Sequence, residues 1–413
     1  MPTFAPFRAY RYAPGTDFAA VIAPPYDVLS DAEIAELKAR DPHNITHIDI
    51  PAGGDLSRPG QIAAVSSDED PYITAAKTMQ DWLNSGVLVH DDVPSYTICR
   101  MRFTDATATQ REIVGVLGGL EVVDQDAPGV LPHERTTPKA VSDRLDLTRA
   151  TGANLSPVWG LSLAAGLTAA LATPGIVVGE LEHEGVLHRV ERIDDPARIA
   201  EITAIIAKDD VLIADGHHRY SISRTYRDEV RAATQRNDSA AEFTLTFVSE
   251  LVEDQLAIEA IHRLYSGIQF QELREILTQS FDIVAVTAPI DRNVLREMVS
   301  LGRLVLLEPT GSAHWLIPRP EVFAQVREID GAYLEHALGA AAAEMTVSFQ
   351  HGLSEMLDAV ASGDYAAGIL IRPTSLAEIH RTARLGLLMP PKSTFFTPKL
   401  RTGFVIRPTG AQQ

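Results

Sequence analysis

Hydrophobic and polar residues follow two periods along this chain, and helical stretches alternate with extended ones. Ile34 and Leu37 recur at helical spacing after Ser30, which forms with Glu33 the pattern of a capping box. Further helices are predicted at 72–84, 196–207, 216–235, 271–279, 291–301, 352–361 and 375–385, with another ending at Gly152. Strands are predicted at 95–103, 112–117, 175–182, 187–192, 211–214, 242–250, 282–286, 304–308, 315–317 and 368–371.

This order of strands and helices predicts an α/β (α+β) protein with mixed sheets and flanking helices. A chain of 413 residues is longer than one compact core usually accommodates. We expect three lobes, at 1–125, 126–265 and 266–413. The segment 51–70, rich in Gly, Pro, Ser and Asp, is expected to be a flexible or functional loop.

Charge and composition narrow the classes of partner. Lys and Arg total 36 against 55 Asp and Glu, a formal net charge of −19, so binding to a phosphate polymer is disfavoured. The single cysteine, Cys99, excludes an internal disulfide and fits a reducing compartment. It lies in a strand pattern, which predicts a buried, inert thiol. We find no signal-peptide pattern and no apolar run long enough to span a membrane, so we expect a soluble, cytoplasmic protein.

The most informative motif is Asp215-Gly216-His217-His218-Arg219, which follows the apolar run 211–214. That run is typical of a buried strand, and Asp215 offers a side-chain oxygen as N-cap for the next helix. Gly216 permits a tight helix entry or a close approach of the backbone to a ligand. The N–H groups of a first helical turn attract anions, and the imidazoles and guanidinium add donors suited to phosphoryl oxygens. The motif therefore predicts a phosphate site; the alternative is a structural cap with exposed histidines.

The two adjacent histidines argue against a metal site. Neighbouring residues diverge by about 100° around a helix, so His217 and His218 cannot easily serve one tetrahedral ion.

The same motif resembles the signature of the ParB/sulfiredoxin-like superfamily. In its ParB, sulfiredoxin and free-serine-kinase members, a Gly-(Cys/His)-x-Arg element holds nucleotide phosphates. The chain as a whole resembles the family named domain of unknown function 1015 (DUF1015). Four stretches carry that resemblance: Ala23-Pro24-Pro25-Tyr26-Asp27-Val28, His133-Glu134-Arg135-Thr136, residues 215 to 220, and Met389-Pro390-Pro391-Lys392-Ser393-Thr394.

The resemblance implies a decorated ParB/sulfiredoxin-like core, in which the segment 23–40 precedes the phosphate turn and a large insertion separates the two. It implies that ATP or ADP is bound by Asp215, Gly216, His217, His218 and Arg219, with Mg²⁺ as the charge bridge. A carboxylate would accept the proton of the substrate hydroxyl. Asp27 and Glu134 are the candidates for that role, beside His217 and His218 as further catalytic groups. The alternative for Asp27 is a solvated loop residue.

Two further polar stretches are candidates for the same site. His133, Glu134, Arg135 and Lys139, followed by Arg144, place a carboxylate beside a histidine and cations, an environment that tunes a general base. The alternative is a solvated loop before a helix.

Lys392, Ser393 and Thr394 follow two prolines that exclude a helical start, and Lys399 comes soon after. The glycines of a Walker motif are absent. This segment is either a positively charged lid over phosphates or an ordinary basic turn.

These observations favour a small-molecule kinase that uses ATP or ADP, because phosphoryl transfer depends on positioning and charge neutralisation. The resemblance makes L-serine, or a similar hydroxyl metabolite, the first acceptor to test. A nucleotide-binding regulatory protein without transferase activity and a phosphoester hydrolase are the alternatives. No nucleic acid and no membrane are expected as partners.

Overall fold

The computed structural model of the chain describes residues 1–51, 70–105, 109–125, 127–132, 141–390 and 392–410. They form two compact units. The first unit comprises Met1–Leu256 together with the chain from Pro398 onward, and the second is Ala257–Thr397. The second unit is therefore an insertion into the first. At the crossing, Ala257 of β13 (Ala257–Glu259) pairs with Thr397 of β20 (Phe395–Thr397).

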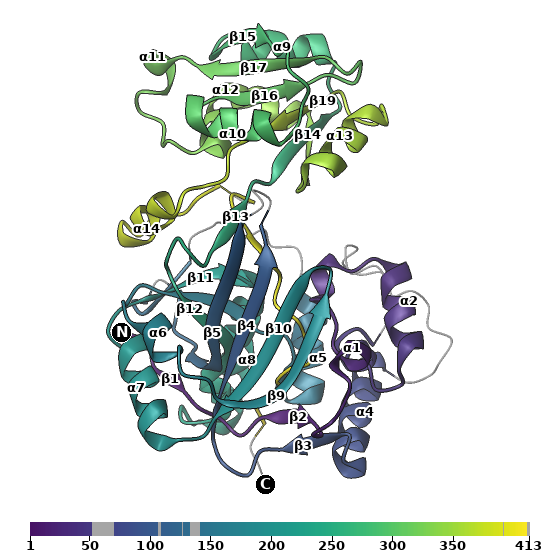
Figure 1. The fold of residues 1–413 in the computed structure, drawn as a ribbon, viewed down its shortest axis with the longest axis vertical. Coiled ribbons are helices and arrows are strands. Elements are labelled where there is room, and N and C mark those ends of the chain that lie inside the picture. The colour runs from purple at the N-terminus through teal and green to yellow at the C-terminus, as the bar shows by residue number, and fades with distance from the viewer. Residues whose placement is uncertain (52–69, 106–108, 126, 133–140, 391, 411–413) are drawn as a thin grey trace. The chain divides into compact units, whose positions relative to one another are not determined.

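The first unit is built on a mixed sheet, visible as the long arrows in Figure 1. Its strand order is β6-β11-β8-β12-β5-β4-β10-β9, with β1 also paired to β5. The pairs β6–β11 and β8–β12 are parallel and the others are antiparallel. The strands are β1 (Phe4–Ala5), β4 (Tyr96–Thr104), β5 (Gln110–Glu121), β6 (Val130–Leu131), β8 (Val158–Ser162), β9 (Ile176–His183), β10 (Val186–Ile193), β11 (Val211–Asp215) and β12 (Phe243–Glu250).

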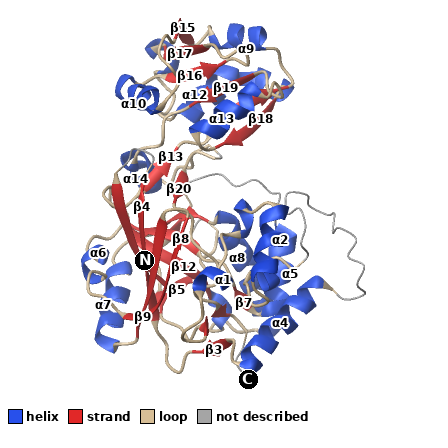
Figure 2. Cartoon of the chain, turned by 45° about the vertical axis from the view of Figure 1, so that its right-hand side comes forward, coloured by secondary structure: helices blue, strands red, loops and turns tan. Residues whose placement is uncertain are grey.

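Helices cover both faces of this sheet, as Figure 2 shows, with α6 and α7 on one side and α5 and α8 on the other. The helices of the unit are α1 (Phe18–Val21), η1 (Tyr26–Val28), α2 (Asp31–Arg40), α3 (Thr46–Asp49), α4 (Pro71–Ser85), α5 (Val141–Thr151), α6 (Leu167–Ala170), α7 (Pro196–Ile206), α8 (His217–Thr234) and η2 (Ala240–Glu242). Two short ribbons complete it: β2 (Tyr10–Tyr12) with β3 (Leu88–His90), and β7 (Ala153–Asn154) with β21 (Arg407–Pro408).

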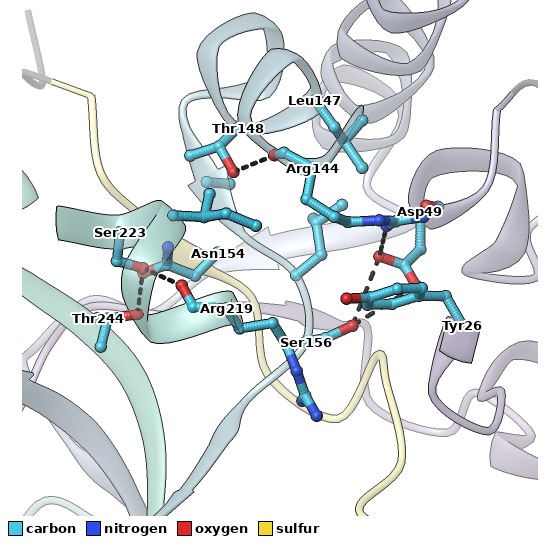
Figure 3. A pocket seen from close by; sticks show the side chains of 13 residues that line it. Tyr26, Asp49, Arg144, Leu147, Thr148, Asn154, Ser156, Arg219, Ser223 and Thr244 are labelled. Atoms are coloured by element: carbon cyan, nitrogen blue, oxygen red, sulfur yellow. Dashed lines mark hydrogen bonds and ion pairs between the residues drawn. The ribbon is translucent and has the colours of Figure 1, made fainter. Parts of the chain in front are cut away.

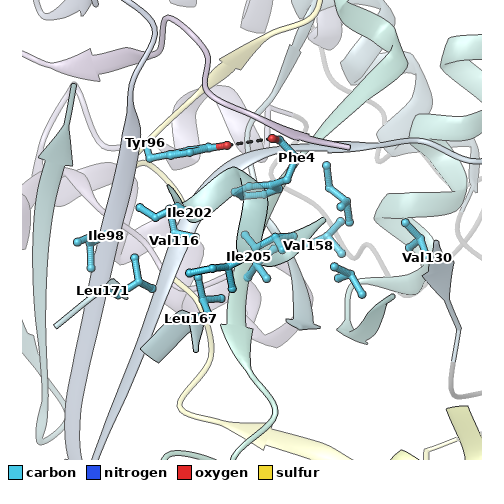
Figure 4. Packing of buried hydrophobic residues seen from close by; sticks show 14 of the residues in the cluster. Phe4, Tyr96, Ile98, Val116, Val130, Val158, Leu167, Leu171, Ile202 and Ile205 are labelled. Atoms are coloured by element: carbon cyan, nitrogen blue, oxygen red, sulfur yellow. Dashed lines mark hydrogen bonds between the residues drawn. The ribbon is translucent and has the colours of Figure 1, made fainter. Parts of the chain in front are cut away.

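The core beneath α6 and α7 is formed by alternate residues of the strands, since side chains one apart point to opposite faces. Tyr96 and Ile98 of β4 lie in this core beside Leu167 and Ile202 (Figure 4). The ring of Tyr96 stacks on Phe4, with centroids 5.1 Å apart. Gly118 is required beneath this pair, because a Cβ there would lie 2.3 Å from the Phe4 ring.

The second unit is an antiparallel sheet between two apolar layers. Its order is β15-β17-β16-β19-β14-β18. In β16, Leu304 and Leu306 pack into one layer, whereas Val305 and Leu307 pack into the other. The elements are β14 (His262–Ser266), α9 (Phe270–Leu277), β15 (Phe281–Ala285), α10 (Arg292–Leu301), β16 (Leu304–Leu307), β17 (Ala313–Pro318), α11 (Pro320–Phe323), α12 (Asp330–Leu338), η3 (Gly339–Glu344), β18 (Thr346–Gln350), α13 (Leu353–Ala361), β19 (Ala367–Leu370) and α14 (Leu376–Arg384).

Local signals in the sequence account for many element ends. Ser30 and Glu33 form the expected capping box of α2. Gly86 ends α4 in the left-handed conformation, and α5 ends just before Gly152. The prediction of an α/β protein with mixed sheets is confirmed.

The expected lobe edges differ from the observed units. No unit ends near 125, because β5 before this point pairs with β12 after it. The expected edge near 265 lies close to the observed boundary after Leu256, but residues from Pro398 onward belong to the first unit. Hydrogen bonds between distant strands decide this grouping. The expected loop at 51–70 falls almost entirely outside the described residues.

Two further expectations concern the burial of Cys99 and the absence of membrane-spanning helices. Cys99 is buried in β4, as predicted, and burial raises the pKa of its thiol to about 12, which keeps it protonated and unreactive. Among the described residues, no helix has the length and apolar character needed to cross a membrane.

His188 of β10 is buried between the sheet and Phe404, whose ring centroid lies 5.7 Å from that of the imidazole. Neither ring nitrogen has a hydrogen-bond partner among the described residues. Burial, with the nearby charges of Arg401 and His183, lowers the pKa of His188 to about 3. The folded protein therefore keeps this ring neutral under conditions in which an unfolded chain protonates it.

We predict that His188→Phe makes unfolding less sensitive to acid. The folded pKa lies below the unfolded one, so stability from the neutral ring is complete above about pH 6.5 and is lost as pH falls toward 3. From pH 7.5 to 5 the wild type should lose about 2 kcal/mol more than the variant. Denaturant unfolding at both pH values measures this difference. Equal losses in the two proteins would contradict the prediction.

Candidate functional site

The turn between β11 and α8 carries the predicted phosphate motif, and its Arg219 lines the candidate pocket. Gly216 adopts a left-handed conformation with φ of 85°, which lets the chain leave the strand and enter the helix within one residue. The expectation that Asp215 caps the helix is wrong: Gly216 is the N-cap residue, and no side chain caps α8. Asp215 is the last residue of β11, and its carboxylate points to two cations instead.

Those cations come from opposite ends of the sequence. One carboxylate oxygen of Asp215 accepts a hydrogen bond from Nη2 of Arg219 at 2.7 Å, and the other accepts from Nζ of Lys399 at 2.9 Å. Burial alone would raise the pKa of Asp215, but the positive charges of Lys399 and Arg219 outweigh it and hold the pKa well below its usual range. Asp215 is therefore an anion at every physiological pH.

Arg219 stabilises the turn through hydrogen bonds from both of its terminal nitrogens. Its Nη1 donates to the carbonyl oxygen of Pro157, and its Nη2 donates to Asp215. Burial lowers the pKa of Arg219, but the charges of Asp215 and Asp27 reverse this and raise it. Because both terminal nitrogens have protein acceptors, the first task of this guanidinium is to fix the turn.

A narrow pocket opens beside Arg219, and the space between protein atoms there, open solvent included, amounts to about 430 Å³. Figure 3 shows its side chains converging from several segments that are distant in the sequence. Apolar residues, hydroxyl groups and buried charges line it together, and the lining residues are Tyr26, Asp49, Arg144, Leu147, Thr148, Ala153, Asn154, Leu155, Ser156, Arg219, Ile222, Ser223 and Thr244.

One wall of the pocket is formed by Tyr26, Arg144 and Asp49. The guanidinium carbon of Arg144 lies 3.8 Å from the centre of the Tyr26 ring, a cation–π contact. Its Nη1 donates to the backbone carbonyl and the carboxylate of Asp49, at 2.6 and 3.0 Å. Burial raises the pKa of Asp49 although the charges of Arg144 and Arg219 oppose it.

The C-terminal segment, residues 398–410, contacts two of the lining residues, Ser156 and Asn154. Thr402 shares a hydrogen bond of 2.9 Å with Ser156, between their hydroxyl oxygens. Arg407 donates to the side-chain oxygen of Asn154 at 3.3 Å, and the backbone N–H of Leu245 donates to the same oxygen at 3.1 Å. This end of the chain therefore contributes to the site through Lys399, Thr402 and Arg407.

The structure brings several of the predicted site residues together. Asp27 is exposed at the end of the 23–28 segment, and its charge acts on Tyr26, Asp49 and Arg219. Arg144 lines the pocket. His217 and His218 lie partly exposed in the first turn of α8. His133, Glu134, Arg135 and Lys139 lie outside the described residues.

The basic segment after Met389 is divided between the two units. Lys399 belongs to the first unit and pairs with Asp215. Lys392, Ser393 and Thr394 belong to the second unit. There Lys392 is exposed, whereas Ser393 is buried and donates to the carbonyl oxygen of Pro390 at 2.7 Å. A role of these three residues as a lid over phosphates stays a prediction.

Sequence reasoning assigned no role to Asp49, Ser156, Ser223, Thr244 or Thr402. Asp49 alternates with Ile48 and Ile50 in the sequence, and nothing in that pattern marks it as a buried partner of Arg144. Ser and Thr are common in any helix, strand or loop. Only the convergence of Ser156, Ser223 and Thr244 on one pocket marks them, with Thr402 bonded to Ser156.

Comparison with known proteins places the chain in a family. A family model described as a protein of unknown function (DUF1015) matches residues 4–333. The chain belongs to the DUF1015 family. The matched range contains three of the four stretches that suggested the family from sequence, and the stretch at 389–394 lies beyond it. No curated protein matches the chain.

Solved structures similar to this DUF1015 protein have low sequence identity to it. A free serine kinase mutant in complex with AMP is 11% identical with a TM-score of 0.38, covering 65% of this chain and 84% of its own. A conserved hypothetical protein from Pyrococcus furiosus is 11% identical with a TM-score of 0.37, covering 68% and 92%. C-terminally truncated SbnI from Staphylococcus aureus is 11% identical with a TM-score of 0.38, covering 70% and 87%.

We predict that Lys399→Met lowers the free energy of unfolding by about 1 to 2 kcal/mol, because it leaves half of the Asp215 carboxylate without its charged donor. The low pKa of Asp215 makes this contribution present above about pH 4 and absent once acid protonates the carboxylate. Urea unfolding at pH 7 measures it. Lys77→Met, at an exposed site on α4, is the control and should change stability by less than about 0.5 kcal/mol. Equal effects of the two substitutions would exclude a special role for Lys399.

Proposed function

We propose that this protein is a nucleotide-dependent phosphotransferase, a small-molecule kinase that moves a phosphoryl group from ATP or ADP to a hydroxyl metabolite. L-serine is the first acceptor to test. The observation that carries the proposal is the turn from Asp215 to Arg219, in which a glycine leads from a buried strand into an 18-residue helix that no side chain caps.

The electrostatics of the turn suit phosphate oxygens. The first turn of α8 presents the positive end of a helix dipole. Asp215 is neutralised by two cations, so the cluster of Asp215, Arg219 and Lys399 carries one net positive charge. A preorganised positive site of this kind stabilises the charge that develops on a transferred phosphoryl group.

The pocket beside the turn supplies a place for a second reactant. In the proposed reaction the acceptor hydroxyl loses its proton to Asp27, and its oxygen forms a bond to the terminal phosphorus of the nucleotide. The bond from that phosphorus to the bridging oxygen breaks, and ADP or AMP leaves. Asp27 fits the role because it is exposed at the chain segment that carries Tyr26, and its charge acts on Arg219. His217 and His218 remain candidates for phosphate contacts and proton transfer.

A magnesium ion fits this site only when it is bound to the nucleotide. The described residues contain no group of three His, Cys, Asp or Glu side chains able to hold a metal. Mg²⁺ commonly binds through substrate phosphates with one or two carboxylates. The ion would be held by the oxygens of the nucleotide and would supply neutralisation of phosphate charge, whereas Asp27 is proposed as the proton acceptor.

Product analysis separates this proposal from its alternatives. The protein is incubated with ATP or ADP, Mg²⁺ and a panel of hydroxyl metabolites that includes L-serine. A phosphorylated acceptor supports the kinase. Nucleotide binding without turnover supports a regulatory protein, and release of free phosphate alone supports a hydrolase.

The turn itself is tested by Gly216→Ala. A Cβ at this position would lie 3.0 Å from Nε of Arg219 and would displace the guanidinium that fixes the turn, in a backbone conformation that disfavours side chains. We expect nucleotide affinity to fall at least about tenfold, measured by calorimetry. Gly185→Ala is the matched control, because Gly185 has a φ of 73° and nothing within 4 Å of its Cβ position. The control carries the same backbone cost and should bind nucleotide normally; equal losses in both variants would remove the turn from the nucleotide site.

The general base is tested by Asp27→Asn. Loss of a positioned proton acceptor should lower kcat by about 10² to 10⁴ while the nucleotide Kd changes little. Asp31→Asn, a neighbouring exposed carboxylate in the first turn of α2, is the control and should keep full turnover. Wild-type kcat in Asp27→Asn would transfer the role to another group, with Glu134 next to be examined.

A further inference from the structure

Arg144 is held in the pocket wall by several contacts. It projects from α5 and is only 7% exposed. Nη1 is bound to Asp49, Nε lies 3.2 Å from the carboxylate of Asp143, and one face of the guanidinium is covered by the Tyr26 ring. These contacts fix the plane and the direction of the group.

Two nitrogens of Arg144, Nε and Nη2, are buried and have no hydrogen-bond partner among the described residues. Nε still lies at ion-pair distance from Asp143, whereas Nη2 has no acidic or polar partner in the described part of the chain. Arg219, in the same pocket, has acceptors for both of its terminal nitrogens. Buried polar groups are almost always hydrogen-bonded, and the cost of leaving one without a partner is larger for a charged group. A cationic donor held rigidly at a pocket and lacking an acceptor therefore points to a ligand atom.

Asn154, another residue that lines the pocket, also has a side chain whose orientation is fixed. The side-chain oxygen of Asn154 accepts hydrogen bonds from Leu245 and Arg407, which fixes the orientation of its amide. The oxygen of the amide is thus already bonded to two protein donors. The group that this orientation leaves for a ligand is the NH₂ donor. Two positioned donors in one pocket favour a ligand rich in acceptor oxygens.

We propose that Arg144 anchors an oxyanion of the bound ligand through Nη2, either the carboxylate of the acceptor or a phosphate of the nucleotide. This inference rests on the proposed phosphotransferase function and adds a second anion contact to it, separate from the turn at Gly216. Charge-assisted hydrogen bonds from arginine to carboxylate or phosphate are among the stronger polar contacts in proteins. Arg144 sets which anion enters the pocket, whereas Arg219 and Lys399 fix the turn.

The test uses equilibrium binding, so that it does not depend on turnover. Calorimetry measures the affinities of L-serine, L-serinamide, inorganic phosphate and ADP for the full chain. The variants are Arg144→Gln, which removes the charge, and Arg144→Lys, which keeps it without the guanidinium fork. Arg149→Gln is the matched control, since Arg149 lies on the same helix, is exposed, and pairs with Asp146 and Glu229. Thermal unfolding shows whether each variant folds. If Arg144→Gln does not fold, Arg144→Lys and Arg144→Gln combined with Asp49→Asn take its place.

A loss of at least tenfold in serine affinity in Arg144→Gln, with serinamide unchanged, supports the proposal and identifies the carboxylate as the oxyanion. The same loss for phosphate and ADP supports it and identifies the nucleotide. Unchanged affinity for every oxyanion, an equal loss in Arg149→Gln, or no binding of any oxyanion to the wild type overturns it. Failure of the proposed function looks different: an oxyanion still binds through Arg144, but no phosphoryl group is transferred.

Discussion

The candidate site depends on one ion pair, between the carboxylate of Asp215 and the ammonium of Lys399. These residues are 184 positions apart, and the whole second unit lies between them in the sequence. The pair ties the turn at the end of β11 to the C-terminal segment, which also holds Ser156 through Thr402 and Asn154 through Arg407. A burial cost that would favour a neutral Asp215 is outweighed by two cations, so the turn keeps a fixed charge.

The site contains two kinds of residue: those whose contacts fix its shape, and those with a donor that has no acceptor in the described part of the chain. Arg219 looks from sequence like the principal phosphate ligand, yet its donors are directed to Pro157 and Asp215. Arg144 looks like one charge among many, yet it carries a buried donor with no acceptor in the described part of the chain. Catalysis by preorganised charge needs both kinds of residue, since a fixed frame keeps the ligand-facing donors in place.

The insertion of the second unit explains why the site combines both ends of the first. The chain leaves at Leu256, forms a separate sheet with two apolar layers, and returns beside its exit through the pair β13–β20. The residues that line the pocket all precede Leu256, and the C-terminal segment adds contacts to this part of the chain through Lys399, Thr402 and Arg407 once it has returned. An insertion at this place leaves the main sheet intact, since its strands all come from before residue 256.

The sequence by itself determined the local structure and the identity of the turn. Capping residues, glycines and hydrophobic periods act within a few residues of one another, so α2, α4, β11 and α8 could be predicted with close bounds. The four motifs also predicted the DUF1015 family, which the match to residues 4–333 confirmed. Only the tertiary structure decided which charges meet. The sequence suggested that Asp215 caps the helix. In the structure Asp215 instead forms ion pairs with Arg219 and with Lys399, which is distant in the sequence. The ion pair between Asp49 and Arg144 was likewise decided by the tertiary structure. The pairing of buried charges depends on how distant elements pack, so no local pattern in the sequence predicts it.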